Sequence, residues 1–350
     1  MNPQEFMAMQ KWDYEDKVYH AEDRMWSFYK KLQGKVFFSL GGIDSATMVL
    51  LGWQRIDPDI PAVTISSIED KSVQTMHKLL AGMGPVIFLK PLKSKVQVIR
   101  EYGYPVIAKD KARRIEHLQK SNNPKQTFIH AIMTGDMGEQ GKYLHSEKIK
   151  LPDKWIRLFG GLYNEHRPDL VCKIAPFRVS DRCCYWMKEK PADNYAKETG
   201  RYPYEGLMAS EGGQRELGLK KNGCNYYGKK VTRSCPFAIF SRQDILRLAL
   251  EMKTPIPAIY GEIKRQPDGT LETTRAKRTG CTMCGFGIHI EKRPHRFDRL
   301  RQDNPKEWEF WMYKMGWGKV LDYIGVAWED RPEQQGRLIP SAALVGGILR

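Results

Sequence analysis

A short segment near residue 40 has the composition of a turn that binds anions. An apolar, β-prone stretch, residues 36–40, leads into Gly41 and Gly42, and a segment typical of a buried helix follows. A strand, a glycine turn and a helix N-terminus together present backbone N–H groups to a phosphate. The glycines allow the anion to approach closely because they carry no Cβ. Ser45 adds a hydroxyl for a phosphate oxygen, and Asp44 beside it indicates Mg²⁺ binding or an orienting role.

Four of the seven cysteines form two pairs whose spacing is typical of a metal site. Cys183 and Cys184 are adjacent, and Cys281 and Cys284 form a CxxC. Four thiolates suit a zinc ion or an iron–sulfur cluster. Adjacent cysteines do not easily hold one small tetrahedral ion because their side chains diverge, whereas a [4Fe–4S] cubane spreads its metal corners over more space. The spacing therefore favours a [4Fe–4S] cluster over zinc, and buried free thiols are the remaining alternative.

Charge and the other cysteines indicate the broad class of the protein. The net charge of +16 and the pI of about 9.4 predict a polyanionic partner or a phosphorylated substrate. Seven cysteines argue against a disulfide framework, so Cys172, Cys224 and Cys235 are expected to be core or spare thiols. No apolar run is long enough to span a bilayer, and residues 1–16 lack a signal-peptide core. We expect a cytoplasmic protein with no membrane partner.

Alternating strand and helix patterns must position the glycine turn. Helices are expected at residues 18–32 and 71–83, and strands at residues 36–40, 60–66 and 85–89. This rhythm indicates βαβ units and a parallel sheet. Ligands bind at the carboxyl ends of the strands in such a sheet, so the glycine turn and residues 67–70 are expected to meet at one site. Glu69 is then placed to hold a ribose hydroxyl or Mg²⁺.

The rest of the chain suggests an insert, further strands and a helical end. Residues 90–166 are basic and helical, further strands are expected at residues 170–174 and 204–210, and Ser241 is expected to cap a helix. The tail from residue 305, rich in Trp and Tyr, is expected to fold back on the core. These patterns predict a helical lead-in at residues 1–32, a nucleotide-binding α/β domain with the basic insert at residues 33–270, and a CxxC segment with a helical region at residues 271–350.

The glycine turn resembles the PP-loop of the ATP pyrophosphatases, which usually reads Ser-Gly-Gly-x-Asp-Ser. Here Leu40 stands where the first Ser of the motif belongs, the serine is one place earlier at Ser39, and Ile43 replaces the frequent Lys. The resemblance implies the adenine nucleotide alpha hydrolase-like fold, a Rossmann-like parallel sheet with helices on both faces, together with an ATP site and Mg²⁺. The nucleotide-binding residues that it implies are Ser39, Leu40, Gly41, Gly42, Ile43, Asp44, Ser45 and Glu69.

Three further segments resemble the PAPS and APS reductases of this superfamily, including phage and bacterial proteins. Residues 181–191 are similar to Cys-Cys-x-x-x-Lys-x-x-Pro. Residues 206–215 are similar to Gly-x-x-x-x-Glu-Ser-x-x-Arg, with Gly212 in place of Ser, and residues 278–289 to Arg-Thr-Gly-Cys-x-x-Cys-x-x-Gly, with a glycine spacing one residue shorter. The resemblance, over roughly residues 33–325, implies a [4Fe–4S] cluster on the four paired cysteines. The residues expected to bind an anion are Lys188, Arg215 and Arg278.

The last part of the sequence bears on which reaction is carried out. The reductases have a nucleophilic cysteine in a Glu-Cys-Gly-Leu-His tail, but no cysteine follows Cys284 here, so the thiol for sulfonyl transfer is missing. We favour an ATP pyrophosphatase that adenylates an acceptor for sulfur transfer to nucleic acid, as in DNA phosphorothioation or tRNA thiolation. Asp44, Ser45 and Arg215 would be catalytic, and a cysteine desulfurase or another sulfur donor would be a partner.

Two alternatives remain open. The first is an APS or PAPS reductase that binds an adenylyl-sulfate nucleotide and uses an external thiol. The second is a non-catalytic nucleic-acid-binding protein with a degenerate loop, and Leu40 is the residue that supports it best.

Overall fold

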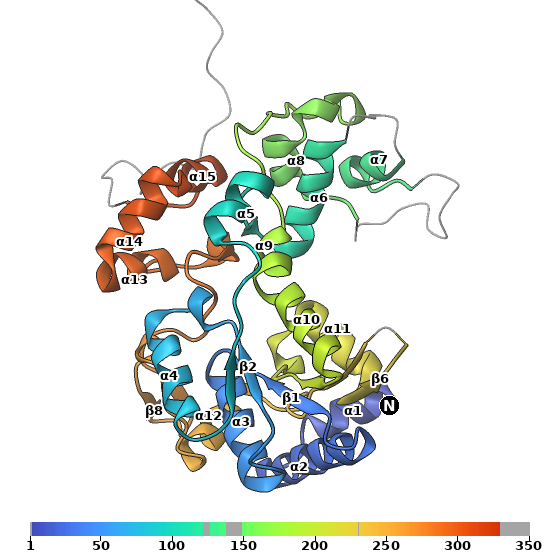
Figure 1. Cartoon of the computed structure of the whole chain (residues 1–350). Helices are drawn as coiled ribbons and strands as arrows, with labels where there is room; N and C mark the ends of the chain where they lie inside the picture. The colour runs from blue at the N-terminus through green and yellow to red at the C-terminus, as the bar shows by residue number, and fades with distance from the viewer. Residues whose placement is uncertain (1, 122–126, 138–148, 230, 330–350) are drawn as a thin grey trace, which may run out of the picture. The chain divides into compact units, whose positions relative to one another are not determined.

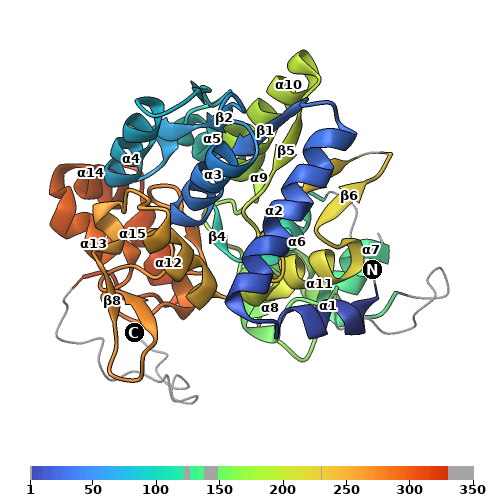
Figure 2. The same ribbon diagram turned by 90° about the horizontal axis from the view of Figure 1, so that it is seen from below.

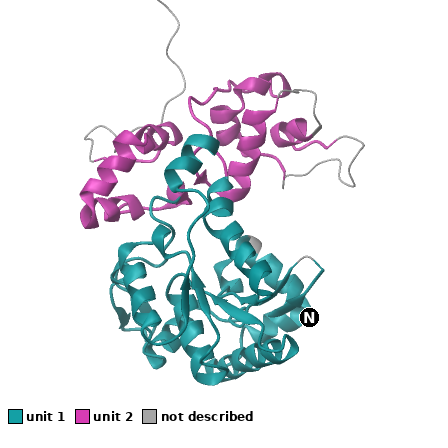
Figure 3. Ribbon diagram, in the orientation of Figure 1, with its two compact units in different colours: residues 1–102, 181–284 teal, residues 103–180, 285–350 magenta. Residues whose placement is uncertain are grey.

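The computed structural model describes residues 2–121, 127–137, 149–229 and 231–329, and it divides into two compact units (Figure 3). Unit 1 consists of residues 1–102 and 181–284, and unit 2 of residues 103–180 and 285–350. These units differ from the expected domains, because the insert begins and ends later and the CxxC segment belongs to unit 1. The Thr282 N–H donates to the Ile68 carbonyl at 3.0 Å, which attaches the CxxC segment to the first stretch of unit 1.

Unit 1 alternates helices and strands along both of its stretches (Figure 1). Its first stretch contains α1 (Pro3–Met9), α2 (Tyr14–Lys31), β1 (Val36–Ser39), α3 (Ile43–Arg55), β2 (Ala62–Thr64), η1 (Ser66–Ile68), α4 (Lys71–Ala81), β3 (Val86–Phe88) and α5 (Lys95–Tyr102). Its second stretch contains α9 (Arg182–Cys184), η4 (Tyr185–Glu189), α10 (Lys190–Thr199), β5 (Tyr202–Tyr204), η5 (Ala209–Glu211), α11 (Gly213–Asn222), β6 (Asn225–Tyr227), β7 (Thr232–Ser234), α12 (Arg242–Glu251), η6 (Ala258–Tyr260), β8 (Ile263–Arg265) and β9 (Leu271–Thr273).

The central sheet of unit 1 has six strands in the order β3-β2-β1-β5-β7-β6. All neighbours run parallel except β6, which is antiparallel to β7. The chain proceeds outward from β1 through β2 to β3 and then returns to place β5 on the other side of β1. The strand order therefore reverses between β1 and β5, which is where ligands bind in open α/β sheets. The expected α/β architecture with a mostly parallel, Rossmann-like sheet is confirmed.

The two faces of the sheet are covered by different helices. Phe38 of β1 belongs to the main core together with Met25 of α2 and Met48 of α3, and these two helices lie side by side (Figures 1 and 2). Phe37, the next residue, points the other way and meets the ring of Tyr195 of α10 at a centroid distance of 5.2 Å. Successive side chains of β1 thus point to opposite faces of the sheet, and both faces are buried, as is typical of parallel sheets.

Several expected elements differ from the structure in their bounds. Helix α2 begins at Tyr14, ahead of the expected residue 18, and β2 ends at Thr64 because residues 66–68 turn into η1. The expected strand at residues 170–174 is wrong: this described segment contains none, and its apolar side chains at Val171 and Ile174 are exposed. The strand expected at residues 204–210 ends at Tyr204. The cap at Ser241 is confirmed, because its side chain forms a capping box with Asp244.

Unit 2 is mostly helical. It contains β4 (Val106–Ile107), α6 (Lys109–Lys120), α7 (Thr127–Thr134), α8 (Asp153–Phe159), η3 (Gly161–His166), β10 (Gly285–Phe286), η7 (Ile288–Ile290), α13 (Arg296–Asp303), α14 (Pro305–Glu309), η8 (Phe310–Lys314) and α15 (Trp317–Ile324). The parallel pair β4–β10 joins its two stretches. The aromatic tail packs within this unit as far as it is described, with Trp317 fully buried against Tyr104 and Phe297, and residues 330–350 lie outside the described part. None of the described helices combines the length and apolar character of a membrane span.

Candidate functional site

The glycine turn lies at the carboxyl end of β1, where the strand order reverses. The Leu40 N–H extends the ladder by donating to the Val63 carbonyl at 2.9 Å, and the Leu40 side chain is buried in the core. The turn closes through Ser45, whose hydroxyl accepts from the Gly41 N–H at 2.7 Å and donates to the Gly42 carbonyl at 2.9 Å. Leu40 therefore contributes its backbone to the turn, and its side chain faces the core.

Helix α3 starts at Ile43 and points its N-terminus at the turn. Its first N–H groups have no acceptor within the helix, so they are available to an anion. The Tyr260 hydroxyl lies 3.4 Å from the Ile43 nitrogen and 2.9 Å from Oγ1 of Thr279. A Cβ on Gly42 would lie only 2.6 Å from that hydroxyl, which explains the glycine. Burial raises the pKa of Tyr260 to about 12, so the phenol stays protonated at neutral pH.

The loop after β5 approaches the turn from the other side of the reversal. A Cβ on Gly206 would lie 3.3 Å from the backbone N and Cα of Ser45, a spacing that favours glycine. The preceding residue, Glu205, forms an ion pair with Arg233 at 2.9 Å. Burial raises the pKa of Glu205, and Arg233 opposes this shift. Ser39, half-buried at the end of β1, lies at the same edge of the sheet.

A histidine lies beneath the turn. His77 of α4 is fully buried, and its Nε2 lies 2.7 Å from the Gly41 carbonyl oxygen. Its Nδ1 lies 2.9 Å from the hydroxyl of Ser66, in η1, and 3.3 Å from the hydroxyl of Thr64, at the end of β2. Burial lowers the pKa of His77, so the ring is neutral at pH 7. The histidine thereby connects the ends of two neighbouring strands.

Asp44 lies in a cationic environment. Its carboxylate forms an ion pair with Arg242, the first residue of α12. Burial raises the pKa of Asp44, and the negative charge of Glu211 adds to this rise. The positive charges of Arg242 and Arg278 act in the opposite direction and lower the pKa. Arg278 is thus close enough to act on the turn, although it precedes the CxxC by only three residues in the sequence.

Arg215 lies on α11 at the same edge of the sheet. Its guanidinium forms an ion pair with Glu211, four residues earlier, and its side chain is about half exposed at 52%. Its charge also lowers the pKa of Glu205. The structure therefore brings Asp44, Arg215 and Arg278 to one edge of unit 1, where their charges influence the same group of carboxylates.

Glu69 and Lys188 connect this edge to the cysteines. The Lys188 ammonium donates to the Glu69 carboxylate at 2.6 Å and also hydrogen-bonds Cys281. Burial alone would lower the pKa of Lys188, but Glu69 and Cys281 together raise it, so the amine stays charged. Lys188 lies in η4, a π-helical turn directly after the adjacent cysteines. Such turns are frequent at functional sites.

The four paired cysteines gather in unit 1. Burial raises the pKa of Cys183 to about 12, with Cys281, Cys184 and Cys284 adding to the shift and Lys95 opposing it. Burial also raises the pKa of Cys281 to about 11. Over the described residues, no three His, Cys, Asp or Glu side chains converge closely enough to hold one metal ion. The thiols are therefore neighbours that do not surround a single point.

The three remaining cysteines have no part in this group. Cys224 and Cys235 are buried in the main core, in agreement with the expected role as core thiols, and Cys172 is half-buried in unit 2. His289 packs its ring against Trp155 in unit 2 at a centroid distance of 5.3 Å.

Sequence reasoning missed His77, Arg242, Tyr260 and Thr279. Arg242 is 198 residues from its partner Asp44, and Tyr260 is 217 residues from Ile43, so no local pattern connects them. Two sequence signals bear on these residues: the cap at Ser241 fixes Arg242 at the first position of a helix, and Thr279 lies in the motif at residues 278–289.

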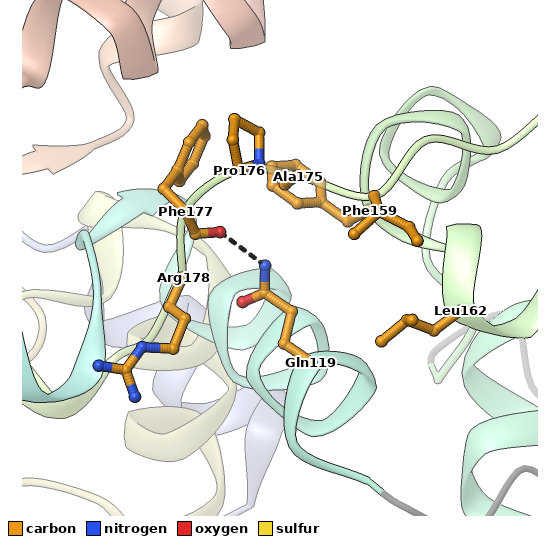
Figure 4. A pocket seen from close by; sticks show the side chains of 8 residues that line it. Gln119, Phe159, Leu162, Ala175, Pro176, Phe177 and Arg178 are labelled. Atoms are coloured by element: carbon orange, nitrogen blue, oxygen red, sulfur yellow. Dashed lines mark hydrogen bonds between the residues drawn. The ribbon is translucent and has the colours of Figure 1, made fainter.

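A cavity of about 300 Å³ lies in unit 2 (Figure 4). The eight described residues that line it include no predicted site residue, and most are apolar, with Phe159, Leu162 and Phe177 among them. Its central amide, Gln119, donates to the Phe177 carbonyl at 2.9 Å and accepts from the Val179 N–H at 2.9 Å. Gln119 therefore stabilises the segment at residues 177–179 through these hydrogen bonds. The cavity contributes no residue to the site at the sheet edge.

Comparisons with known proteins find similar folds among solved structures alone. No protein-family model matches the chain, and no curated protein matches it. Among solved structures, the chain is similar to a phosphoadenylyl-sulfate (PAPS) reductase from Candida auris, determined as a phosphate complex. The two chains are 10% identical, the alignment covers 67% of this chain and 83% of that one, and the TM-score is 0.34. The function must therefore be argued from the residues of this chain.

Proposed function

We propose that this chain is an ATP pyrophosphatase of the PP-loop type, which adenylates an acceptor and thereby prepares it for sulfur transfer. The observation that carries the proposal is the position of the glycine turn at the strand-order reversal, with the N-terminus of α3 directed at it. This is the part of a parallel sheet where a nucleotide phosphate meets backbone N–H groups.

The phosphates of ATP would bind on the turn from residue 39 to residue 45. Gly41 and Gly42 leave room for the anion, and Gly206 keeps the opposite wall close to Ser45. Ser45 bonds both glycines of the turn, and its hydroxyl would turn to a phosphate oxygen when the nucleotide binds. Leu40 provides no hydroxyl where the usual motif has one, and its N–H donates to the Val63 carbonyl. Ser39 and Ser45 would therefore be the serines of the site.

Asp44 and Arg242 would act on the charge of the triphosphate. Mg²⁺ prefers carboxylate oxygens, and Asp44 provides one beside the turn. Arg242 opposes the rise that burial causes in the pKa of that carboxylate, and it would turn toward a phosphate when Mg²⁺ takes over its partner. Arg215 and Arg278, on the same edge, would stabilise the negative charge that develops on the α-phosphoryl group.

The reaction itself would be an in-line displacement. An oxygen of the acceptor attacks the α-phosphorus, the bond from that phosphorus to the bridging oxygen breaks, and pyrophosphate leaves with the bonding electrons. A sulfur nucleophile can then displace AMP from the adenylated acceptor. In this step the chain binds and orients the nucleotide and neutralises charge, which are the main contributions of a protein to phosphoryl transfer.

The four paired cysteines fit a [4Fe–4S] cluster. Their donor set is four sulfurs in one neighbourhood, with Lys95 beside Cys183 and Lys188 beside Cys281, and four thiolates are the usual ligands of such a cluster. Cys183, Cys184, Cys281 and Cys284 would hold the cluster, which supplies electron transfer or a bound sulfur when present. Lys188, paired with Glu69, would balance the negative charge of the thiolates.

Nucleic acid is the proposed acceptor, because the chain carries a net charge of +16. An excess of positive charge of this size attracts a polyanion over a long range. DNA for phosphorothioation and tRNA for thiolation are the two candidates, and a cysteine desulfurase is the proposed sulfur source.

The proposal is tested by measuring pyrophosphate release from ATP and Mg²⁺ by anaerobically purified protein, with duplex DNA, with tRNA and without either. We expect release that depends on one nucleic acid and is lost in Ser45→Ala. Release of sulfite from APS or PAPS in the presence of a thiol would show a reductase instead. Salt-sensitive nucleic-acid binding without ATP binding would show a non-catalytic protein.

A further inference from the structure

The carbonyl of Gly41 has an unusual partner for a residue in a phosphate-binding turn. It accepts a hydrogen bond from the buried ring of His77 at 2.7 Å, across 36 residues of sequence. A carbonyl oxygen can only accept, so Nε2 of His77 must carry the proton. In a neutral ring Nδ1 is then an acceptor, and the hydroxyls of Ser66 and Thr64 donate to it. All hydrogen-bonding atoms of this ring are therefore used in one fixed tautomer.

The geometry of the peptide group transmits this constraint to the turn. The Gly41 carbonyl and the Gly42 N–H belong to the same planar trans peptide, in which C=O and N–H point in opposite directions. When His77 holds the carbonyl toward the buried side of α4, the Gly42 N–H must point away from the core. That is the side on which an anion can enter.

A glycine pair needs such a constraint. Gly41 and Gly42 have wide conformational freedom, so the peptide between them can rotate unless something holds it. Ser45 fixes the two outer groups of this pair, the Gly41 N–H and the Gly42 carbonyl. The peptide group between them is held by His77.

We propose that His77 is a positioning residue of the phosphate site, which aims the Gly42 N–H at the anion by holding the Gly41 carbonyl. This inference rests on the proposed nucleotide site and adds a residue to it that does not touch the nucleotide. This role needs a hydrogen-bond donor at the position of Nε2. The side-chain amide of glutamine can donate from a similar place, so glutamine should preserve part of the function of His77.

The experiment compares His77→Met, which keeps bulk but has no donor, with His77→Gln. Binding of Mg²⁺ and α,β-methylene-ATP is measured by calorimetry, and thermal unfolding is measured in parallel. We expect His77→Met to lose at least tenfold in affinity, because one charge-assisted hydrogen bond to phosphate is misdirected. His77→Gln should stay within about threefold of the natural protein.

His295 offers a matched control in unit 2. It is also buried, and its Nε2 also donates to a backbone carbonyl, that of Ala327 at 2.9 Å. His295→Met should lower the unfolding temperature but leave nucleotide affinity unchanged. Equal affinity losses in His77→Met and His295→Met, or in His77→Met and His77→Gln, would show a merely structural role and overturn the proposal.

The tautomer gives a readout that does not depend on the variants folding. Correlation of ring nitrogens and protons by NMR should show His77 with its proton on Nε2, and a proton on Nδ1 instead would contradict the inference. If the natural protein does not bind the ATP analogue, the proposed function fails and this inference fails with it. If the natural protein binds and His77→Met binds equally well, only this inference fails.

Discussion

The glycine turn and the cysteine neighbourhood lie in the same unit but are held in different ways. The turn is held by hydrogen bonds that the chain makes with itself, through Ser45 and His77. The cysteines Cys183 and Cys281 are packed against apolar side chains such as Ile68, and burial raises their pKa far above neutrality. The turn is therefore formed before any ligand arrives, whereas the cysteines need a metal to become thiolates.

This difference indicates which of the two regions depends on metal binding for its final structure. A preformed anion site can bind nucleotide in the freshly folded chain. A thiol with a raised pKa becomes a ligand only when a metal displaces its proton, so metal binding and local structure are coupled. Lys188 is the contact between the two regions, because it pairs with Glu69 and with Cys281.

The largest effect should come from removing a cysteine. Cys183→Ala or Cys281→Ala should reduce the iron and sulfide of anaerobically reconstituted protein from about four of each per chain to almost none, because each thiolate would hold one iron of the cluster. Affinity for the ATP analogue should change by less than about threefold, since the turn is held independently. Chemical iron and sulfide analysis and calorimetry are the measurements.

Cys172→Ala is the matched control for these variants, because this half-buried cysteine lies in the other unit. It should keep its full iron content. A single zinc ion per chain, or full iron in Cys183→Ala, would contradict the assignment of the ligands. A large loss of nucleotide affinity without the cluster would contradict the independence of the two regions.

A methyl group on Gly42 should nearly abolish nucleotide binding. In Gly42→Ala the new Cβ would lie 2.6 Å from the Tyr260 hydroxyl and 3.1 Å from Oγ1 of Thr279, so the turn or Tyr260 must move. We expect a loss of about a hundredfold in affinity for the ATP analogue, comparable to about 2.7 kcal/mol, with the iron content unchanged. Gly218→Ala in α11, where a Cβ would meet nothing within 4 Å, is the control and should bind normally.

Replacing Arg242 should have a smaller effect that depends on pH. In Arg242→Gln the pKa of Asp44, already raised by burial, rises further because its ion pair is lost. Binding of Mg²⁺ needs the ionised carboxylate, so the acid limb of the rate of pyrophosphate release should move to higher pH, with a loss of about tenfold at pH 7.

The loss of stability in Arg242→Gln should also depend on pH, in a direction that can be predicted. A carboxyl whose pKa is raised by folding binds its proton more tightly in the folded state, so its contribution to stability is present at low pH and is lost as the pH rises through the folded pKa. The unfolding temperature of the variant should therefore be furthest below that of the natural protein at high pH, and the gap should narrow on acidification. An unchanged gap between pH 5 and pH 8 would rule out this role of the pair.

The sequence is sufficient to predict the turn, because its glycines and the following helix are contiguous. It is not sufficient for the partners of the turn: His77 looks like one more residue of an amphipathic helix, and Arg242 is distant in the chain. The failed strand at residues 170–174 has a related cause. Its apolar pattern is real, but Val171 is 82% exposed, and none of the described strands pairs with this segment.

The strand predicted at residues 204–210 shows how the site overrides local propensity. Its apolar residues favour a longer strand, but Gly206 must lie against the backbone of Ser45. The chain therefore leaves the sheet after Tyr204, and Met208 and Ala209 pack into the core from a turn. Only the tertiary structure places this turn opposite the phosphate site.

The smallest predicted effect concerns the Tyr260 hydroxyl, which lies beside the first N–H of α3. The Tyr260 hydroxyl lies 3.4 Å from the Ile43 nitrogen, a long contact with an N–H that a phosphate oxygen would also use. Tyr260→Phe removes this competitor and should raise affinity for the ATP analogue by about two- to fivefold, while the unpaired Thr279 hydroxyl lowers stability by about 1 kcal/mol. Tyr29→Phe, whose hydroxyl bonds Asp57 away from the turn, should leave affinity unchanged. A loss of affinity in Tyr260→Phe would instead mean that the phenol donates to the bound phosphate, and the turn would then depend on its ligand as the cysteines do.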